Sequence, residues 1–487
     1  MSTAMRTVDV ASIIDQRRLT AFNYGLIVLS WLITVFDGFD MMMVSFTAPY
    51  MRDQFALSKT MLGYVFSAGL VGMMLGGFFF SFLADRIGRR PTVVLAAFTF
   101  GMLTTATAFA DSYHALLVLR FVDGFAIGGM LPLAWALNIE FVPVRMRSTI
   151  VTIIMMGYSF GTAVAGPMTN WIAPKHGWQG VYFAGGIGTL ICATALWLRL
   201  PESIRFLVTK GLKPELVAKT LKRMDPASDV TAADHFVLSD ERKAVRQFHV
   251  GDLFLGKLAL ITPLLWLGYI ASSLAIYFAA SWGPIVLESL KFPRDKSALV
   301  ASLGGIMGAV AGLALMRFTD RFGPRAVAFY PALALPVLLM QGFGVIPISL
   351  FLIANVLGAM LVSGEHFGIL SIAGIFYPSA IRASGAGWAT SVAKVGGILG
   401  PIVGAAVLSS GLPVIRSYAL LAVCPAVLLC CALGIHVAAR AHSPQSQLID
   451  SPPVEGEPEA RITRLLGATS RVALLKQLAK LCELGRH

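Results

Sequence analysis

The chain has 487 residues, of which 56% are hydrophobic and only 13% are charged. A soluble protein carries roughly twice that charged fraction, so the composition excludes an ordinary soluble protein and indicates a membrane protein. A net charge of +13 could suggest nucleic-acid binding. The basic residues lie between hydrophobic runs rather than in one basic domain, however, which argues against a nucleic-acid partner.

Cysteine usage and the start of the chain argue against two further classes. Four of the five cysteines lie in apolar runs and Cys482 lies in the tail, and none is spaced with histidine as metal ligands are. We therefore expect neither a metal site nor a disulfide framework. Residues 1–20 are polar and the apolar run that follows is long and interrupted by acids. We expect no cleavable signal peptide and interpret that run as a retained first helix.

Hydrophobic runs of membrane-spanning length follow one another along most of the chain. A helix that rises about 1.5 Å per residue needs about twenty apolar residues to cross the hydrocarbon core. The polar stretch 200–257 divides the runs into six and six. The sequence therefore predicts an all-α membrane protein with twelve transmembrane helices. The predicted spans are 22–46, 61–83, 92–110, 115–138, 149–171, 178–199, 258–282, 297–317, 326–345, 347–370, 385–408 and 416–439.

The positions of the basic residues set the expected orientation. With the N-terminus placed in the cytoplasm, thirty lysines and arginines fall on the cytoplasmic side and seven on the external side. Leaving out the central loop and the tail, which weigh less, still gives twelve against seven. Both termini are therefore predicted to be cytoplasmic. The expected divisions are an N-terminal segment (1–20), a first six-helix half (21–199), a cytoplasmic central loop (200–257), a second six-helix half (258–440) and a cytoplasmic tail (441–487), in which 460–485 could form a basic amphipathic helix.

Four landmarks indicate that the second half repeats the first. Three of them recur at one constant offset, and the offset of the fourth differs from it by a single position. Such agreement over six helices indicates two parallel pseudo-repeats, an architecture that places the substrate site between the halves near the membrane midplane. The matched landmarks are Pro49 with Pro284, Asp85-Arg86-x-Gly88 with Asp320-Arg321-x-Gly323, Pro143-x-x-x-Arg147 with Pro378-x-x-x-Arg382, and Gly166-Pro167 with Gly400-Pro401.

Two acids in the first span are candidates for proton coupling. Ionisable groups within hydrocarbon are costly and are functional candidates by default. Asp37 and Asp40 are three residues apart and share one face of the first helix. Burial and mutual repulsion would favour a proton on at least one of them, which could then be carried across the membrane. The alternative is that both are neutralised by structural partners.

Arg120 lies in the fourth span, about as deep as Asp40 lies in the first. A buried arginine needs an anion, and Asp37, Asp40, Asp123 or a substrate carboxylate could supply it. Exchange between these partners would couple the substrate to the proton. The alternative is a permanent pair between Arg120 and Asp123.

Three further buried groups are candidates in the second half. Lys394, in the middle of the eleventh span, could balance an anionic substrate. Glu365 and His366 lie together in the tenth span. His366 could relay protons, but a helix-packing role is equally open.

A further set of charges is expected at the cytoplasmic ends of the spans. The turn between the second and third spans contains a glycine that permits a tight bend, and its charges can cap helix ends or pair across the halves. We interpret this set as a cytoplasmic gate rather than as substrate ligands. Its members are Asp85, Arg86, Gly88, Arg89, Arg90, Glu140, Arg147, Asp320, Arg321 and Arg382.

Several motifs in these spans form a recognisable set. They are Asp37-Gly38-Phe39-Asp40, Ala48-Pro49, Arg120-Phe121-x-x-Gly124, Glu140-x-x-Pro143-x-x-x-Arg147 and Tyr377-Pro378-x-x-x-Arg382-Ala383-x-Gly385. The set resembles the aromatic acid:proton symporters, a family of the major facilitator superfamily, over about residues 20–440. The paired aspartates are the more selective mark, because the motif that begins at Asp85 is shared by the whole superfamily.

The resemblance implies proton-driven uptake of benzoate-like or hydroxybenzoate-like acids across a bacterial inner membrane. The chain departs from the family at Lys394, where arginine is usual, and so loses a bidentate carboxylate clamp. Ser81 and Met316 stand where the family pattern has glycine. The resemblance implies that transport depends on Asp37, Asp40, Arg120, Glu140 and Arg382.

Other functions stay open at this stage. They are uptake of another organic anion, efflux of drugs or solutes, and a chemoreceptor with a transporter fold. We expect no enzyme, because the sequence has no nucleophile–base arrangement, nucleotide loop or metal cluster. We also expect no cofactor besides the proton gradient, and a monomer in the lipid bilayer.

Overall fold

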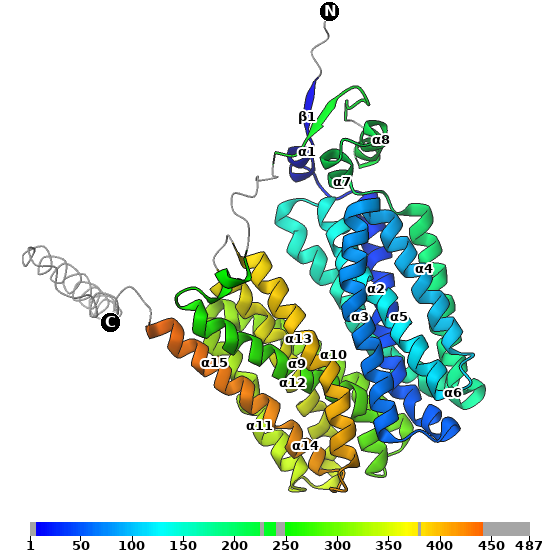
Figure 1. Cartoon of the computed structure of the whole chain (residues 1–487), viewed down its shortest axis with the longest axis vertical. Helices are drawn as coiled ribbons and strands as arrows, with labels where there is room; N and C mark the ends of the chain where they lie inside the picture. The colour runs from blue at the N-terminus through cyan, green and yellow to red at the C-terminus, as the bar shows by residue number, and fades with distance from the viewer. Residues whose placement is uncertain (1–5, 225–227, 240–248, 378–380, 442–487) are drawn as a thin grey trace, which may run out of the picture. The chain divides into compact units, whose positions relative to one another are not determined.

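Long helices make up most of the computed structural model, which describes residues 6–224, 228–239, 249–377 and 381–441. Side chains are described for these residues except 316–325, 370–376, 382–383 and 439–441. The first half consists of α2 (Ala21–Phe55), α3 (Lys59–Ile87), α4 (Arg89–Thr107), α5 (Tyr113–Glu140) and α6 (Arg147–Arg199). The second half consists of α9 (Leu258–Ser289), α10 (Arg294–Phe322), α11 (Phe329–Gly342), α12 (Ile348–Phe376), α13 (Arg382–Ser409), α14 (Arg416–Leu421) and α15 (Val423–Ala441) (Figure 1).

Nine helical stretches within the described ranges are long and apolar enough to cross a membrane. One of them, α6, contains both the fifth and the sixth predicted spans. Gly177 interrupts it with φ +66° and ψ 179°, a conformation that only glycine adopts readily. The two predicted spans are therefore two helical segments joined at this glycine.

Glycines bring the helices of each half into close contact. A side chain at Gly38 of α2 would collide with the backbone carbonyl of Tyr158 on α6. In the same way, Gly72 of α3 packs against the carbonyl of Phe121 on α5. Backbone-to-backbone packing of this kind is typical of membrane helices, where small residues let the helices approach closely and van der Waals packing drives their association.

The two halves touch where α3 packs along α13. The hydroxyl of Ser67 donates to the carbonyl of Ile398 at 2.8 Å. Nearer the loop between α2 and α3, Nζ of Lys59 donates to the carbonyl of Leu408 at 2.6 Å. These contacts join the N-terminal part of α3 to the C-terminal part of α13.

A second set of contacts joins the same ends of other helices. The amide of Asn170 on α6 donates to the carbonyl of Asp295 on α10 at 3.1 Å. Arg294, at the start of α10, binds Asp53 near the end of α2 at 3.0 Å and also pairs with Glu288 of α9. The halves are thus held together at the ends that the sequence predicts to be external.

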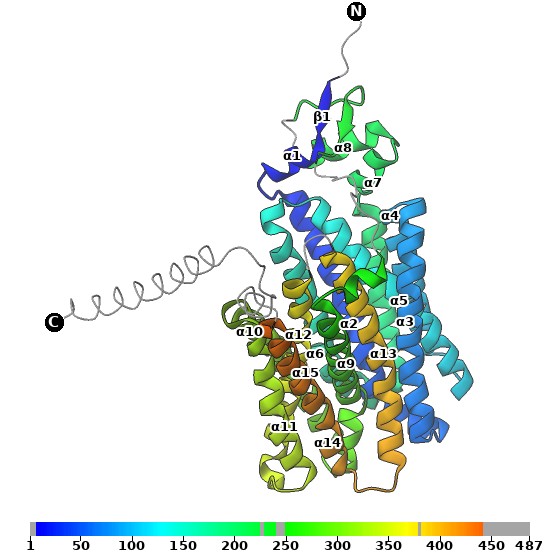
Figure 2. The ribbon, with the colours of Figure 1, turned by 60° about the vertical axis from the view of Figure 1, so that its left-hand side comes forward.

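The N-terminal segment and the central loop fold together beyond the other end of the first half (Figure 2). Strand β1 (Thr7–Asp9) pairs in parallel with β2 (His235–Val237), with Thr7 opposite His235. Helices α1 (Val10–Asp15), α7 (Ile204–Thr209) and α8 (Pro214–Met224) complete this cap, and short 3₁₀ turns lie at Val144–Met146, Val250–Phe254 and Gly323–Ala328.

The cap is stabilised by an apolar core and by a hydrogen bond to the backbone of a neighbouring loop. Val10 and Ile14 of α1 share one buried cluster with Leu207 of α7 and Leu221 of α8. Asp15 accepts a hydrogen bond from the backbone of Val144 at 2.6 Å, which ties the cap to the loop after α5. The sequence predicted only a polar segment and a loop here. The predicted amphipathic helix at 460–485 lies outside the described residues.

Candidate functional site

A buried ion-pair network joins α2 to α5. The guanidinium of Arg120 binds both carboxylate oxygens of Asp40 at 3.0 Å. The same guanidinium donates to Asp123, one turn along α5, at 2.9 Å, and Thr104 of α4 donates to the other oxygen of Asp123 at 3.1 Å. The three charged side chains are at most 4% exposed. Arg120 therefore pairs with two of its predicted partners at once.

Glycines on α3 and α5 make room for this network. A Cβ at Gly69 of α3 would lie 3.6 Å from Nη2 of Arg120, so the guanidinium lies against bare backbone. Gly124 of α5 packs on the carbonyl of Gly69. This close approach of α3 and α5 lets Arg120 reach Asp40 on α2.

Asp37 is a buried acid of the first half that has no ion-pair partner among the described side chains. It is fully buried, and neither of its carboxylate oxygens has a hydrogen-bond partner in the described part of the chain. It interacts electrostatically with Tyr158 on α6 and with Tyr277 on α9 of the second half. The region around Arg120 therefore holds three buried carboxyl groups and one guanidinium, and the extra acid lies toward the other half of the molecule.

The side chain of Lys394, on α13 of the second half, reaches the first half of the molecule. A Cβ at Gly77 of α3 would lie 3.4 Å from Nζ of Lys394 and 3.3 Å from the carbonyl oxygen of Gly128 on α5. Lys394 is partly buried, and no carboxylate among the described side chains forms an ion pair with it. Its ammonium group is thus available to an anion between the halves.

Glu365 and His366 lie apart from this network. Glu365 is fully buried, and neither carboxylate oxygen has a hydrogen-bond partner among the described residues. Nδ1 of His366 lies 3.1 Å from the hydroxyl of Ser272 on α9. The hydrogen bond described for His366 reaches α9 and not Arg120.

A separate polar network lies at the cap end of the first half. Glu140 pairs with Arg89 and accepts a hydrogen bond from the hydroxyl of Ser203. Glu202 accepts hydrogen bonds from the backbone nitrogens of Arg89 at 3.0 Å and Arg90 at 3.1 Å. A carboxylate in this position satisfies the free N–H groups at the start of α4 and complements the helix dipole.

Sequence reasoning missed Glu202 and Ser203. The available signal was a pair of polar residues directly after the sixth predicted span, next to Pro201. Gly88 has a φ of +107°, which allows the tight turn into α4.

The other predicted gate residues are distributed less compactly. Asp85 and Arg86 are exposed, and the guanidinium of Arg86 lies 4.1 Å from the ring of Phe82. Arg90 donates to the carbonyl of Trp197 at 2.8 Å. Nε of Arg147 is buried without a partner among the described residues. The side chains of Asp320, Arg321 and Arg382 lie outside the described part of the structure.

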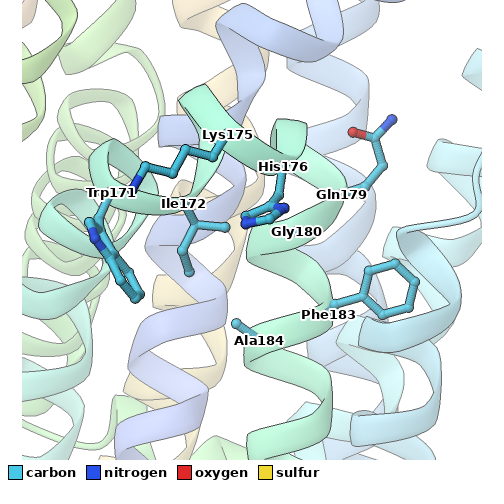
Figure 3. A pocket seen from close by; sticks show the side chains of 8 residues that line it. All are labelled: Trp171, Ile172, Lys175, His176, Gln179, Gly180, Phe183 and Ala184. Carbon is cyan, nitrogen blue, oxygen red and sulfur yellow. The ribbon is translucent and has the colours of Figure 1, made fainter.

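A pocket of about 600 Å³ lies at the turn within α6 and holds none of these charged residues. Figure 3 shows Trp171 and Lys175 before the break at Gly177 and Gln179 and Phe183 after it. Its lining residues all belong to the two helical segments of α6.

Comparisons with known proteins agree on the class of molecule. Residues 30–329 match the family described as the Major Facilitator Superfamily. The chain is 32% identical over 406 residues to the gallate transporter of Pseudomonas putida, covering 83% of this chain and 90% of that one. It is 31% identical over 413 residues to the 4-hydroxybenzoate transporter PcaK of Pseudomonas aeruginosa, covering 84% and 91%.

Solved structures show the same fold at low identity. A bacterial homologue of the human lysosomal transporter Spinster, in an inward-facing and occupied conformation, matches with a TM-score of 0.66 at 15% identity, covering 87% of this chain and 99% of that one. The xylose transporter XylE from E. coli, in a partially occluded inward-open conformation, matches with a TM-score of 0.63 at 16% identity, covering 90% and 100%.

Proposed function

This chain belongs to the Major Facilitator Superfamily, and on that premise we propose that it imports an aromatic monocarboxylate together with protons. The two relatives named above are transporters of gallate and of 4-hydroxybenzoate. Both compounds combine a benzene ring, at least one hydroxyl group and one carboxylate. A transporter for such anions in the inner membrane needs a cation for the carboxylate and a group that binds the coupling proton.

The proposed topology has twelve transmembrane segments with both termini in the cytoplasm. The nine apolar stretches count α6 once and leave out α4 and α11. Dividing α6 at Gly177 and adding α4 and α11 gives twelve. The distribution of lysine and arginine supports the orientation, which places the cap in the cytoplasm. Because the site lies between two halves of one chain, a monomer is sufficient.

The observation that carries the proposal is the excess of buried acid around Arg120. One guanidinium can balance one carboxylate, and two further carboxyl groups, Asp37 and Asp123, lie within or beside the same network. A buried carboxylate without a compensating charge is costly. We assign the transported proton to Asp37, because Asp40 is held by two hydrogen bonds to Arg120.

The substrate carboxylate is assigned to Lys394. Arg120 is already engaged by two carboxylates, whereas the ammonium of Lys394 has no ion-pair partner among the described side chains. An aromatic anion bound there would lie against the glycine surface of α3 and α5 at Gly77 and Gly128. Lysine supplies a point charge and fixes the carboxylate orientation less than arginine would.

Alternating access follows from where the halves touch. With the proposed orientation, the contacts of Lys59, Asn170 and Arg294 close the external side. The described state is then closed outward, and its substrate and proton leave toward the cytoplasm. Glu140, Arg89 and Glu202 hold the inner end of the first half as one unit, while Asp85 and Arg86 stay exposed for contacts in the opposite state.

The test is transport by the purified protein in proteoliposomes. We expect labelled 4-hydroxybenzoate to accumulate inside when the outer solution is more acidic, with acidification of an internal pH dye. Asp37→Asn should abolish this accumulation but retain exchange of labelled for unlabelled substrate, since exchange needs no net proton movement. Asp111→Asn, the same change at an exposed position, is the matched control and should behave like the wild type.

Three results would replace the proposal. Binding without flux would indicate a chemoreceptor, outward movement of drugs would indicate an efflux antiporter, and accumulation of aliphatic acids alone would change the substrate class. Proton-driven uptake that survives Asp37→Asn would refute the assignment of the proton site.

A further inference from the structure

We infer that Glu365 is a second proton-binding carboxyl group, located in the second half, and that two protons accompany each aromatic carboxylate. The inference deepens the proposed function and rests on it. It concerns the number of protons moved, which the network around Arg120 does not determine.

The first observation is that Glu365 shares its situation with Asp37. Among the described side chains, these two are the carboxyl groups that are buried with both oxygens lacking a hydrogen-bond partner. Each is fully inaccessible to solvent. A carboxylate in this situation has neither donors nor a cation to offset the loss of hydration, so the buried group needs a bound proton.

The second observation is the chemistry of the surroundings. Among the described side chains, the thiol of Cys424 in α15 is a titratable group that interacts with Glu365 from another helix. From α11, the ring of Tyr330 packs at Gly364, while its hydroxyl donates to the carbonyl of Ala311 on α10. No arginine or lysine among the described side chains forms an ion pair with Glu365. Its charge is therefore compensated by a proton rather than by a counter-ion.

The third observation places this group at the depth of the first proton site. The repeat offset that matches Pro49 to Pro284 also matches Asp37 to Ser272. Ser272 is the partner of His366, and Glu365 is the adjacent residue on α12. Successive residues in a helix differ by only about 1.5 Å in height, so Glu365 lies close to the level of Asp37 in the opposite half.

The number of protons determines the net charge that moves with each substrate molecule. One proton moved with one monoanion carries no net charge, whereas two protons carry one positive charge inward. With two protons, the membrane potential alone drives accumulation, to roughly 50-fold at about 100 mV. In this cycle Glu365 accepts its proton while the external side is open and releases it while the cytoplasmic side is open.

The experiment uses the purified full chain in proteoliposomes with labelled 4-hydroxybenzoate. Uptake is measured under two driving forces, a pH gradient without a potential and a valinomycin-imposed potential without a pH gradient. We expect the wild type to respond to both. Glu365→Gln should lose the response to the potential alone and retain the response to the pH gradient, because it keeps Asp37, whose proton is required for net uptake. Glu365→Asp should retain both.

Gln341 provides a matched control. It is buried on α11, faces Gly358 of α12, and its side-chain amide also has no partner among the described residues. Gln341→Leu alters a buried polar group beside the same helix without removing a proton, and should leave both responses intact.

The outcomes separate the two proposals. A wild type that responds to the pH gradient but not to the potential moves one proton, which overturns this inference and leaves the proposed function standing. A response to the potential that persists in Glu365→Gln also overturns it. A wild type that responds to neither gradient refutes the proposed function itself. If Glu365→Gln fails to fold, the wild-type responses and those of Glu365→Asp decide the matter.

Discussion

The two halves share sequence landmarks and helix packing, but they hold their buried charges differently. In the first half, Arg120 is bound by Asp40 and Asp123 in a compact network, and Asp37 is a buried acid outside it. In the second half, Lys394 and Glu365 have no ion-pair partner among the described side chains. Paired charges are suited to holding a structure, and unpaired charges are suited to binding a ligand or a proton. We therefore expect substitutions of the paired charges of the first half and of the unpaired charges of the second half to have different effects.

The largest effect is expected from Arg120→Gln. Breaking a buried ion pair leaves uncompensated charge and typically costs about 3–5 kcal/mol, and here two carboxylates lose their cation. The variant should lose transport and much of its thermal stability in detergent. Arg120→Lys keeps the charge but loses the bidentate geometry. Its transport and its thermal stability should lie between those of the wild type and those of Arg120→Gln. An Arg120→Gln variant as stable as the wild type would show that the network is not structural.

Lys394→Gln should separate binding from stability. Losing a hydrogen bond to a charged group costs about 1.5–3 kcal/mol, which corresponds to a rise of roughly 10- to 100-fold in the KM for 4-hydroxybenzoate. Thermal stability should change little, because no described partner is left unpaired. Lys394→Arg is the control and should preserve or lower the KM. A large loss of stability with an unchanged KM would assign Lys394 to the fold.

Much of this contrast was accessible from the sequence, and the exceptions have physical causes. The helical membrane fold and the superfamily are confirmed. They could be predicted because long apolar runs and repeated landmarks can be read directly from the sequence. The candidate partners of Arg120 could be predicted because Arg120 and Asp40 were expected at similar depths in the membrane. Which of Asp37 and Asp40 faces the guanidinium could not be predicted, since residues three apart share a face and helix rotation decides between them.

The cap and the contacts of Glu202 were missed for a different reason. They depend on polar segments that meet from distant parts of the chain, such as β1 with β2. Such contacts leave no periodic pattern in the sequence. The twelve-segment count and the orientation stay predictions.

A smaller effect is expected at the external contact between the halves. Arg294 binds Asp53 and Glu288, and these side chains are 37%, 54% and 20% exposed. Exposed ion pairs contribute about 0.2–1 kcal/mol, so Arg294→Gln should shift the balance toward the outward-open state by up to roughly fivefold. The readout is labelling of Ser302→Cys by an impermeant maleimide, since Ser302 is buried near Gly166 between α6 and α10. Unchanged labelling would mean that this contact does not close the external side.

The smallest effect is expected in the cap, at Asp9. Partial burial alone would raise the pKa of this carboxyl, but hydrogen bonds from Ser239, Ser12 and Ala11 outweigh it and lower the pKa below the ordinary value of 3.8. A lowered pKa contributes stability above the unfolded value, and this contribution is lost as the pH falls through the folded value. Asp9→Ala removes the N-cap of α1 and should destabilise the cap by about 1 kcal/mol at pH 7.

The measurement for Asp9 is hydrogen exchange in β1 and α1. Exchange should be faster in Asp9→Ala than in the wild type at pH 7, and the difference should shrink below about pH 4, where the wild-type carboxyl also begins to bind a proton. Proton-driven uptake should be unaffected, because no contact of the described part of the cap reaches Asp37 or Lys394. Reduced uptake in this variant would mean that the cap takes part in the movement of the first half.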